Sequence, residues 1–420
     1  MTSLSGAISR SSGSSALSLY HLLDPEVLAN PYPLFQRLRT EDPVHWDVFL
    51  HTWVVTRYVD VLEVLHKFSA NRTHTPAKLS AMGLGDMSPL AQLMVKMMLF
   101  MDPPEHSRLR GLASSAFSPA RVAVLRTHIR EIVKRLLDEV QDKGEMDVIH
   151  DLGDPLPAIV TTEMLGVPTS DRHQLKAWST DFAEMLGNFQ HNPEHAPRML
   201  RAVQEMTSYF HDQVRLQKDH PGEGLVHSLM AAEVDGDRLT EEEVVATCIV
   251  TMVGGLETTT NLIGNGVLTL LRNPVEMERL RNDFSLIPSA VEEMLRYESP
   301  SQHTGRIASD DVEMGGKLIR RGQAVMAVMA AANRDPERFP DPDRFDISRS
   351  DNRHLAFGWA AHFCFGAALA RVEGQEVFEA IMRRLQDLEL TPGRLTWRNN
   401  LGLRGMTALP IKFRASQAIA

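Results

Sequence analysis

Helical periodicity is the feature that most constrains the fold of this chain. Apolar residues recur at intervals of three and four along most of its 420 residues, a spacing that gathers them on one helix face. Alternating patterns typical of strands are few and lie toward both ends. We therefore expect a mainly α-helical protein with small β-sheets at its edge. The clearest predicted helices are residues 120–140, 241–271, 290–297 and 367–385, and the clearest predicted strands are residues 52–56, 323–329 and 407–413.

The chain shows no internal domain boundary. Its length would suit about two or three domains, but no Pro-, Gly- or Ser-rich linker occurs after about residue 25. We therefore predict a single domain over residues 21–420, preceded by a disordered Ser-rich leader over residues 1–20. This leader lacks the charged start and apolar run of a signal peptide, and its one basic residue, Arg10, makes a transit peptide a weaker option. No stretch approaches the roughly 18 apolar residues of a membrane span, so no membrane anchor is expected.

Composition argues against several classes of function. With 43% hydrophobic and 23% charged residues, the chain matches an ordinary soluble globular protein. Its formal net charge of −10, without a basic tract interleaved with aromatics, argues against nucleic acid as a partner. Its two cysteines, Cys248 and Cys364, cannot form a disulfide framework, which fits the reducing cytoplasm. Cys248 lies in an apolar predicted helix and is expected to be a core residue.

Cys364 occupies an unusual stretch, FGWAAHFCFGAALAR, which spans residues 357–371. It stands just before the helix expected to begin near Ala367, where free N–H groups and the helix dipole favour a thiolate. Gly366 would let the backbone approach whatever the sulfur binds, and Phe357 and Phe363 would shield the sulfur from water. A buried cysteine that packs as a small hydrophobe is the alternative. Zinc is poorly supported, because no second cysteine completes a CxxC pair.

A second motif interrupts the long apolar helix. The sequence VGGLETTTN, residues 253–261, places two glycines side by side inside that helix. Each costs roughly 1 kcal/mol relative to alanine, so something should require the missing side chains. Close helix packing is one explanation. The neighbouring carboxyl and hydroxyl of Glu257 and Thr258 suit a general-acid task, which is the functional explanation.

Two further motifs are ambiguous when taken alone. In EEMLR, Glu293 and Arg296 are three apart on one helix face, where such a pair is most often a solvated salt bridge. In MDPPEHSRLR, two prolines suit a helix start, and His106 and Arg110 project from one face four residues apart. The alternative for this second pair is a solvent-facing polar stripe.

Together these motifs resemble the cytochrome P-450 family. The form F-G-x-x-x-H-x-C-x-G followed by A-x-L-A-R is similar to its haem-binding loop, and the other motifs follow the family's order. The resemblance extends from about residue 24 to residue 413 and includes NPYPLFQRLR, AFSPARV and ANRDPERFPDPDRFD. It implies a P-450 fold of the soluble bacterial type, with haem b between a long distal helix and the loop that supplies Cys364 as axial thiolate. Ala360 departs from the pattern, because the family normally has glycine there.

The resemblance also implies roles for individual residues. Thr258 would hydrogen-bond dioxygen, and Glu257 would help relay protons to it. Four donors would surround the haem propionates, namely His106, Arg110, Arg306 and His362, while Gly366 and Phe357 complete the cofactor loop. A structural network that supports this loop would consist of Glu293, Arg296 and Arg344.

The function implied by the resemblance is a haem-thiolate monooxygenase, which inserts one atom of O2 into a lipophilic small molecule. A polyketide or related secondary metabolite is the expected substrate; a fatty acid, terpenoid or steroid is an alternative. Oxidative coupling or peroxygenase chemistry, and a non-enzymatic haem sensor, are rival functions. Family topology places the pocket walls in residues 72–100, 182–199, 252–258, 301–304 and 401–407. The predicted substrate contacts are Met98, Met252, Gly255, Gln302 and His303.

Electrons are expected to come from separate proteins. No glycine-rich dinucleotide fingerprint follows a predicted strand, so NAD(P)H would act only indirectly. The resemblance implies ferredoxin and ferredoxin reductase as donors, docking near the surface under Cys364. An exposed arginine such as Arg108 would attract an acidic partner there.

Overall fold

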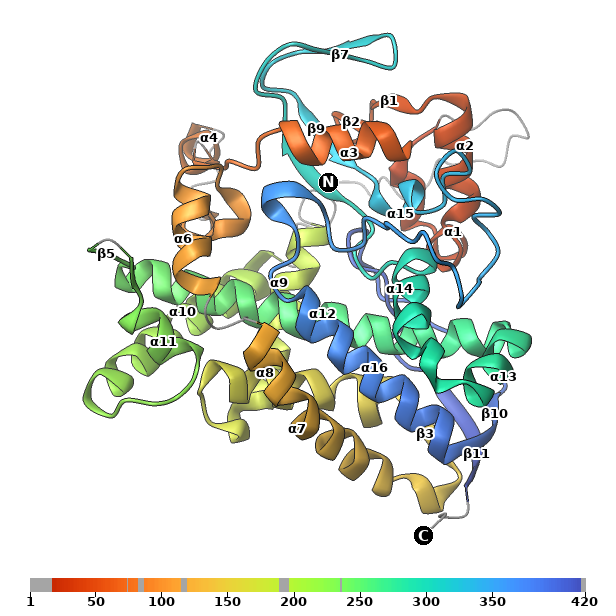
Figure 1. Cartoon of the computed structure of the whole chain (residues 1–420). Coiled ribbons are helices and arrows are strands. Elements are labelled where there is room, and N and C mark those ends of the chain that lie inside the picture. Colours follow the sequence, from red (N-terminus) through yellow and green to blue (C-terminus); the bar gives the residue numbers. More distant parts are fainter. Residues whose placement is uncertain are drawn as a thin grey trace.

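The computed structural model describes residues 17–73, 75–81, 87–114, 119–188, 196–234 and 236–416. Helices form most of the molecule, and a four-stranded sheet lies at its edge, at the top of Figure 1. The α-helices are α1 (Pro25–Ala29), α2 (Tyr32–Glu41), α3 (Tyr58–Lys67), α4 (Thr75–Ala81), α5 (Ser88–Met94), α6 (Glu105–Ala113), α7 (Pro119–Asp138), α8 (Pro155–Leu165), α9 (Arg172–Asn188), α10 (Ala196–Asp219), α11 (Leu225–Ala231), α12 (Glu241–Arg272), α13 (Pro274–Asn282), α14 (Ile287–Tyr297), α15 (Met329–Ala332) and α16 (Ala367–Arg384). Shorter helical turns are η1 (Leu19–Leu23), η3 (Met98–Phe100), η5 (Gln141–Lys143), η6 (Val148–Gly153), η7 (Thr169–Asp171), η9 (Phe284–Leu286) and η10 (Ala360–His362).

The largest sheet joins two strands from the N-terminal part of the chain to two strands that lie beyond α14 in sequence. Its strand order is β1-β2-β9-β6, and β2 pairs with β9 in parallel, with Trp53 opposite Val325. A three-stranded sheet has the order β10-β11-β3. The strands are β1 (Val44–Asp47), β2 (Thr52–Val55), β3 (Glu145–Asp147), β4 (Glu233–Val234), β5 (Asp237–Arg238), β6 (Thr304–Ile307), β7 (Val312–Met314), β8 (Lys317–Ile319), β9 (Ala324–Ala327), β10 (Leu385–Leu390) and β11 (Pro410–Ala415).

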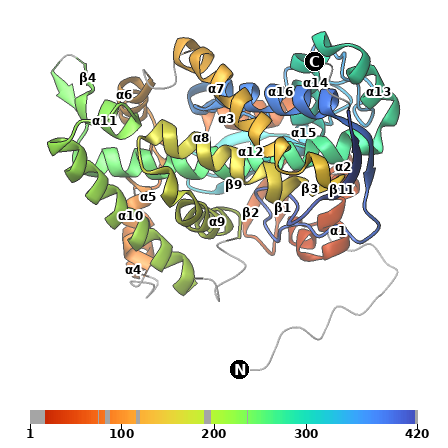
Figure 2. The same ribbon diagram turned by 90° about the horizontal axis from the view of Figure 1, so that it is seen from below.

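The long helix α12 crosses the middle of the molecule (Figure 2). A capping box starts it: the Thr240 hydroxyl accepts from the Glu243 N–H, and the Glu243 carboxylate accepts from the Thr240 N–H. Its first half, through Leu256, packs into one apolar cluster, and its second half, from Leu262 onward, packs into another. The polar residues 257–261 therefore lie where the two clusters meet.

Most of the predicted elements are confirmed. The predicted helices appear as α7, α12, α14 and α16, and the predicted strands appear as β2, β9 and β11. Cys248 is fully buried in the cluster around the first half of α12, and burial raises the pKa of its thiol, which confirms a core residue. Among the described residues, no helix is both long and apolar enough to cross a membrane.

The predicted boundary at residue 20 is wrong. The hydroxyl of Ser18 donates to the Asp47 carboxylate over 2.8 Å, and the side chain of Leu19 is buried in the cluster beneath the sheet. These residues therefore belong to the domain. The rest of the predicted leader, residues 1–16, lies outside the described residues.

Candidate active site

Cys364 lies in a tight loop that ends where α16 begins. Its N–H donates to the Phe357 carbonyl over 2.7 Å, so the loop closes on itself. Cys364 is half-buried and packs with Phe357 against the apolar cluster around α16. Phe363 contacts the ring of Phe357 but is 37% exposed. The predicted position before a helix is confirmed, and Phe357 rather than Phe363 covers this part of the loop.

Opposing effects act on the thiol of Cys364. Burial raises the pKa of this thiol, and the Gly366 N–H together with the charges of Arg110 and Arg371 lowers that pKa by less. A metal ion bound to the sulfur would remove the proton outright. The thiolate therefore stays a prediction.

Ala360 adopts the backbone conformation for which glycine is usually required. Its φ is +56°, in the left-handed region, and Gly358 two residues earlier has φ +70°. An alanine in this region costs roughly 1–2 kcal/mol because its Cβ crowds the following carbonyl. The cysteine loop therefore accommodates Ala360 in place of the usual glycine as local backbone strain. The change removes no side chain that the loop uses.

One face of α12 is open in the middle of an otherwise buried helix. Val250, Gly254 and Thr258 are four residues apart, lie on one face and are all at least partly exposed. A Cβ built on Gly254 would meet no described atom within 4 Å. Phe365, which follows Cys364, packs against the same apolar cluster as Val250. The open face of α12, formed by Val250, Gly254 and Thr258, therefore lies near the cysteine loop.

The two adjacent glycines of α12 have different explanations. A Cβ on Gly255 would lie 2.8 Å from the hydroxyl oxygen of Thr161 on α8. Gly255 therefore allows α12 to pack closely against α8, and its contact with substrate stays a prediction. Gly254, which was not predicted as a site residue, is the glycine that faces open space.

Four polar residues predicted to bind propionates converge beside Cys364. His106 and Arg110 come from α6, Arg306 from β6 and His362 from η10. The imidazole centroids of His106 and His362 are 4.3 Å apart. The charge of Arg110 lowers the pKa of both His106 and the thiol of Cys364, so it lies near both groups. The structure thus brings the four side chains together.

This cluster contains nitrogen atoms without partners in the described part of the chain and too little negative charge. The buried atoms His106 Nδ1, Arg306 Nε and His362 Nε2 have no hydrogen-bond partner among the described residues. Burial, followed by repulsion from Arg306 and His106, lowers the pKa of His362 to about 4. Burial and the charge of a nearby arginine, Arg72, lower the pKa of Arg306 to about 10. Because unpaired buried polar groups are costly, the cluster fits a ligand that brings carboxylates.

Glu257 and Thr258 have different surroundings. The Thr258 hydroxyl donates to the Gly254 carbonyl over 2.6 Å, on the open face. Glu257 is 3% exposed, and its carboxylate accepts from Lys176 over 2.7 Å and from Arg398 over 2.9 Å. A third donor is the hydroxyl of Thr180, at 2.8 Å. The carboxylate is therefore held by residues of α9 and of the C-terminal segment.

Two of the predicted substrate contacts are structural. Met252 is fully buried in the apolar cluster, and Gln302 donates its side-chain N–H to the Ser299 carbonyl over 2.6 Å while only 4% exposed. Both predictions are corrected for this reason. Met98, at 6% exposure on η3, and the half-buried His303 stay predictions. Parts of the expected pocket wall, residues 82–86 and 189–195, lie outside the described residues.

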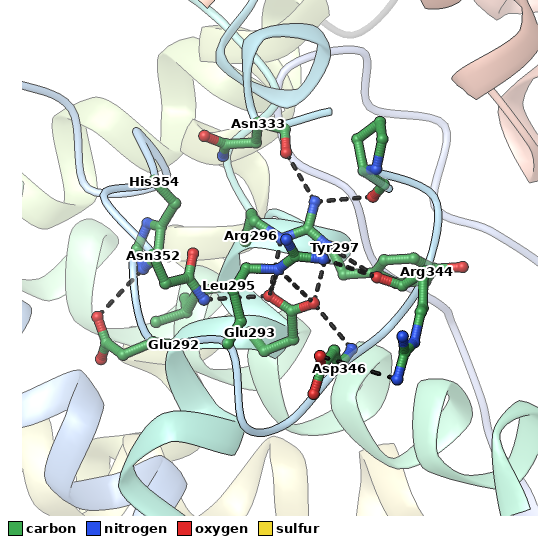
Figure 3. A network of polar contacts seen from close by, with 12 residues as sticks. Glu292, Glu293, Leu295, Arg296, Tyr297, Asn333, Arg344, Asp346, Asn352 and His354 are labelled. Atoms are coloured by element: carbon green, nitrogen blue, oxygen red, sulfur yellow. Dashed lines mark hydrogen bonds and ion pairs between the residues drawn. The ribbon is translucent and has the colours of Figure 1, made fainter. Parts of the chain in front are cut away.

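The predicted glutamate and arginine network is present, and Figure 3 shows Glu293, Arg296 and Arg344 within it. The arginine side chains that bind Glu293 differ from the prediction in one position. Arg296, fully buried, donates to Glu293 over 2.7 and 2.8 Å and to the Asn333 carbonyl over 2.9 Å. The carbonyl of Arg344 accepts from Arg296, while its side chain is 63% exposed and reaches Asp346 at 3.9 Å rather than Glu293. The guanidinium that reaches Glu293 belongs to Arg349, at 3.2 Å. The predicted role of the Arg344 side chain is therefore wrong.

The prediction for Arg108 is also wrong. Its guanidinium forms ion pairs with Asp237, at 3.2 Å, and with Glu243. Because two carboxylates already neutralise Arg108, it does not offer a free positive charge to a partner.

The residues that the sequence analysis missed are remote partners. Lys176 and Arg398 lie 81 and 141 residues from the Glu257 that they bind. Neither belongs to a motif, so no local pattern identifies them. Arg349 follows the PDRF motif within a few residues, but spacing alone does not show which arginine turns inward.

These features define a class of protein: a helical protein with a half-buried cysteine, a cluster of buried nitrogens without partners among the described residues, and open space beside a long central helix. That combination fits a haem-thiolate protein. The chain belongs to the cytochrome P450 family, whose model matches residues 85–412.

Comparison with individual proteins supports this assignment. The chain is 40% identical to the biotin biosynthesis cytochrome P450 of Bacillus subtilis, over 92% of this chain and 97% of that protein. It is 38% identical to the cytochrome P450 monooxygenase PikC of Streptomyces venezuelae, over 93% of each. The crystal structure of the myxobacterial cytochrome P450 CYP267B1 in complex with myristic acid superposes with a TM-score of 0.86 at 36% identity, covering 94% of this chain and 99% of that one. The chain is therefore an oxidoreductase of this family.

Proposed function

We propose that this protein is a haem-thiolate monooxygenase that hydroxylates or epoxidises a lipophilic small molecule. The reaction consumes O2, two electrons and two protons, places one oxygen atom in the substrate and releases the other as water. The observation that carries the proposal is the set of buried nitrogens beside Cys364 that have no partner among the described residues, namely His106 Nδ1, Arg306 Nε and His362 Nε2. A cofactor with two carboxylates would satisfy them, and membership of the family supports haem b as that cofactor.

Each residue of the site has a defined task in this proposal. Haem b, when bound, supplies the one-electron and O2 chemistry that amino-acid side chains lack. Cys364 is the proposed iron ligand, Phe357 screens the loop from water, and Gly366 donates its N–H to the sulfur. The proposed propionate donors form charge-assisted hydrogen bonds, which are the strong ones; they are His106, Arg110, Arg306 and His362.

Thr258 and Glu257 are the proposed proton-handling residues. The Thr258 oxygen lies on the open face, and rotation about χ1 would free its hydrogen from the Gly254 carbonyl. Glu257 must first release one of its donors before it can pass a proton toward Thr258, because Lys176 and Arg398 occupy both its oxygens. The two ion pairs therefore keep the Glu257 carboxylate bound until one of them breaks.

Replacing Thr258 tests this assignment. We expect Thr258→Ala to lower product formed per electron several-fold and to raise hydrogen peroxide, because general acid catalysis contributes typically 10²–10⁴-fold. Thr259→Ala is the matched control, since Thr259 is only 3% exposed and lies off the open face. Unchanged yield per electron in Thr258→Ala would remove Thr258 from the proton route.

A long-chain acyl compound is the proposed substrate class, whether a polyketide, as the resemblance implies, or a fatty acid. The clusters near the site are rich in methionine and leucine, which suits a lipophilic ligand. A relative named for biotin biosynthesis and a structural relative crystallised with myristic acid support an acyl chain. A terpenoid or steroid is the alternative class.

The proposed electron donor is a ferredoxin, reduced by its NAD(P)H-dependent reductase in the cytoplasm. The exposed rings of Trp359 and Phe363 lie on the cysteine loop. Arg353, in the segment that leads into this loop, has a side chain that is 78% exposed, and its ion pair with Asp351 is 3.7 Å long. Exposed rings together with an exposed arginine suit a small acidic partner. Arg353→Glu is expected to slow reduction by ferredoxin while leaving reduction by dithionite unchanged. Equal ferredoxin kinetics would exclude this face.

The decisive experiment is the absorbance spectrum of the purified protein, reduced and exposed to carbon monoxide. A Soret band shifted strongly to the red in the wild type and in Cys248→Ser, but lost in Cys364→Ser, is the expected result. Substrate-dependent NAD(P)H consumption with surrogate redox partners would then separate an enzyme from a haem sensor. A protein without haem, or with histidine-ligated haem, would contradict the proposal.

A further inference from the structure

Arg72 is a half-buried arginine at the border between the sheet edge and the helical part of the molecule. Ser69, three residues earlier, forms a β-bridge with Ile307 at the end of β6. The N–H of Arg72 donates to the Phe100 carbonyl of η3 over 3.2 Å. The backbone of Arg72 is therefore fixed between the strand that carries Arg306 and the short helix that carries Met98.

The side chain of Arg72 is bound by carbonyl groups alone. Its Nη1 donates to the carbonyls of Ala70, at 3.1 Å, and Asn71, at 3.0 Å, and its Nη2 donates to the Gly305 carbonyl at 3.3 Å. Within the described ranges, no carboxylate lies within the 4.0 Å of an ion pair with this guanidinium. Burial of an arginine is costly unless the charge is paired, and this half-buried guanidinium has no anionic partner among the described residues.

The guanidinium of Arg72 keeps donors that these carbonyls do not use. Nη1 donates to two of the carbonyls and Nη2 to one, and no residue in the described part of the chain accepts from Nε–H. An arginine has five N–H donors in a planar fork that matches the two oxygens of a carboxylate. The three carbonyls thus hold the guanidinium in place and leave Nε–H for a further acceptor.

The surroundings of Arg72 carry excess positive charge. Its charge lowers the pKa of Arg306, which places the two guanidinium groups close together. The nearest acid is Asp102, whose carboxylate already accepts from the Ser69 hydroxyl at 2.5 Å and the Ala70 N–H at 2.8 Å. Burial lowers the pKa of Arg72, and Asp102 raises it by less. An anion at this position would therefore be attracted.

Apolar residues adjoin this positive position. Phe100, which accepts from Arg72, and Met98 belong to or pack against the apolar cluster that includes Val253 of α12. A cation at the border of an apolar wall suits a carboxylate that carries a long hydrocarbon chain.

We propose that Arg72 is a carboxylate-binding residue at the rim of the cofactor site. Two sources can supply the carboxylate: the acid end of a long-chain substrate, or a propionate of the haem. The proposal rests on the proposed function, since it takes the haem site and an acyl substrate as given.

The test uses the haem-loaded protein and three variants. Arg72→Gln removes the positive charge. Arg72→Lys keeps the charge but lacks the planar pair of N–H donors, and Arg281→Gln is the matched control. Arg281 is also a part-buried arginine that donates to two carbonyls, those of Met382 and Leu385, remote from the site. The affinities for tetradecanoate and tetradecan-1-ol are measured by titration, followed by the change in the spin state of the haem iron. The rate of haem loss from each protein is measured by transfer to apomyoglobin.

The outcomes distinguish the two sources. If the substrate supplies the carboxylate, Arg72→Gln weakens tetradecanoate at least tenfold and tetradecan-1-ol less than twofold, with unchanged haem transfer and partial recovery in Arg72→Lys. If a propionate supplies it, haem leaves Arg72→Gln several-fold faster, with the ratio of the two affinities unchanged. Values equal to those of Arg281→Gln in both measurements would overturn the proposal. The carbon monoxide spectrum of the same preparations reports separately on the proposed function.

Discussion

At the scale of single residues, the structure shows where this chain tolerates unfavourable local arrangements. Ala360 is held in a left-handed conformation, and Glu373 on α16 is a carboxyl that is 2% exposed with an Oε2 that has no partner among the described residues. Both lie in or beside the segment that positions Cys364. Such local costs persist when surrounding packing determines the conformation.

Replacing Ala360 by glycine should stabilise the protein. Glycine adopts a positive φ without the Cβ crowding of alanine, so Ala360→Gly is expected to add about 1 kcal/mol to the free energy of unfolding. The thermal midpoint of the haem-loaded protein is the measurement. Gly358→Ala is the reverse substitution at a position with φ +70°, and it should lower the thermal midpoint. A lower midpoint for Ala360→Gly would show that the strain is not significant.

Glu373 should make stability depend on pH. Burial raises the pKa of its carboxyl from 4.5 to about 8 in the folded protein. Because the unfolded chain ionises first, the stability contributed by the protonated Glu373 carboxyl is fully present below about pH 4.5. That stability is lost as the pH rises to 8. Relative to wild type, Glu373→Gln should therefore gain stability between pH 5 and 8, on the order of 4 kcal/mol. A difference in unfolding free energy that stays constant with pH would contradict this.

At the scale of elements, local patterns predicted helices well but predicted their orientations poorly. The spacing that marks residues 241–271 as a helix depends only on neighbours along the chain, and so does the position of Cys364 before α16. Which of two adjacent glycines faces open space depends on α8, which lies far away in sequence. The partners of Glu257 were missed for the same reason. Motifs thus identify a site, and tertiary packing decides which side chains complete it.

The meander between α15 and α16 offers a direct test of that distinction. Arg349→Gln removes a largely buried guanidinium from Glu293, so it should destabilise the protein by about 3 kcal/mol. Arg344→Gln, at an exposed side chain, should change stability by less than about 0.5 kcal/mol. The thermal unfolding of both variants is the measurement. If Arg344→Gln loses more stability than Arg349→Gln, Arg344 is the third member of the network, as the motif predicted.

At the scale of the whole molecule, one buried arginine joins three distant parts of the chain. Arg404 donates to the Glu298 carboxylate over 2.7 Å and to the carbonyls of Leu28 and Ala29. The hydroxyl of Tyr32 donates to the same carboxylate over 2.9 Å. This cluster fastens the N-terminal helices and the C-terminal loop to the end of α14, next to the turn that leads into β6.

Loss of this arginine should affect the fold as a whole. Arg404→Met leaves the buried Glu298 without its main cation, and breaking such a pair costs about 3–5 kcal/mol. We expect a thermal midpoint lowered by several degrees, in contrast to Arg414→Met, whose pair with Asp387 is mostly exposed. Equal midpoints for the two variants would show that the cluster is dispensable.

The order of the strands has a consequence for protein synthesis. Because β2 pairs with β9, residues 52–55 cannot complete their sheet until residues 324–327 have left the ribosome. The proposed cofactor groups are similarly divided, with His106 made early and Cys364 made late. The nascent chain therefore exposes an unfinished sheet edge and half a binding site through most of its translation, and haem can be captured only in its final stage.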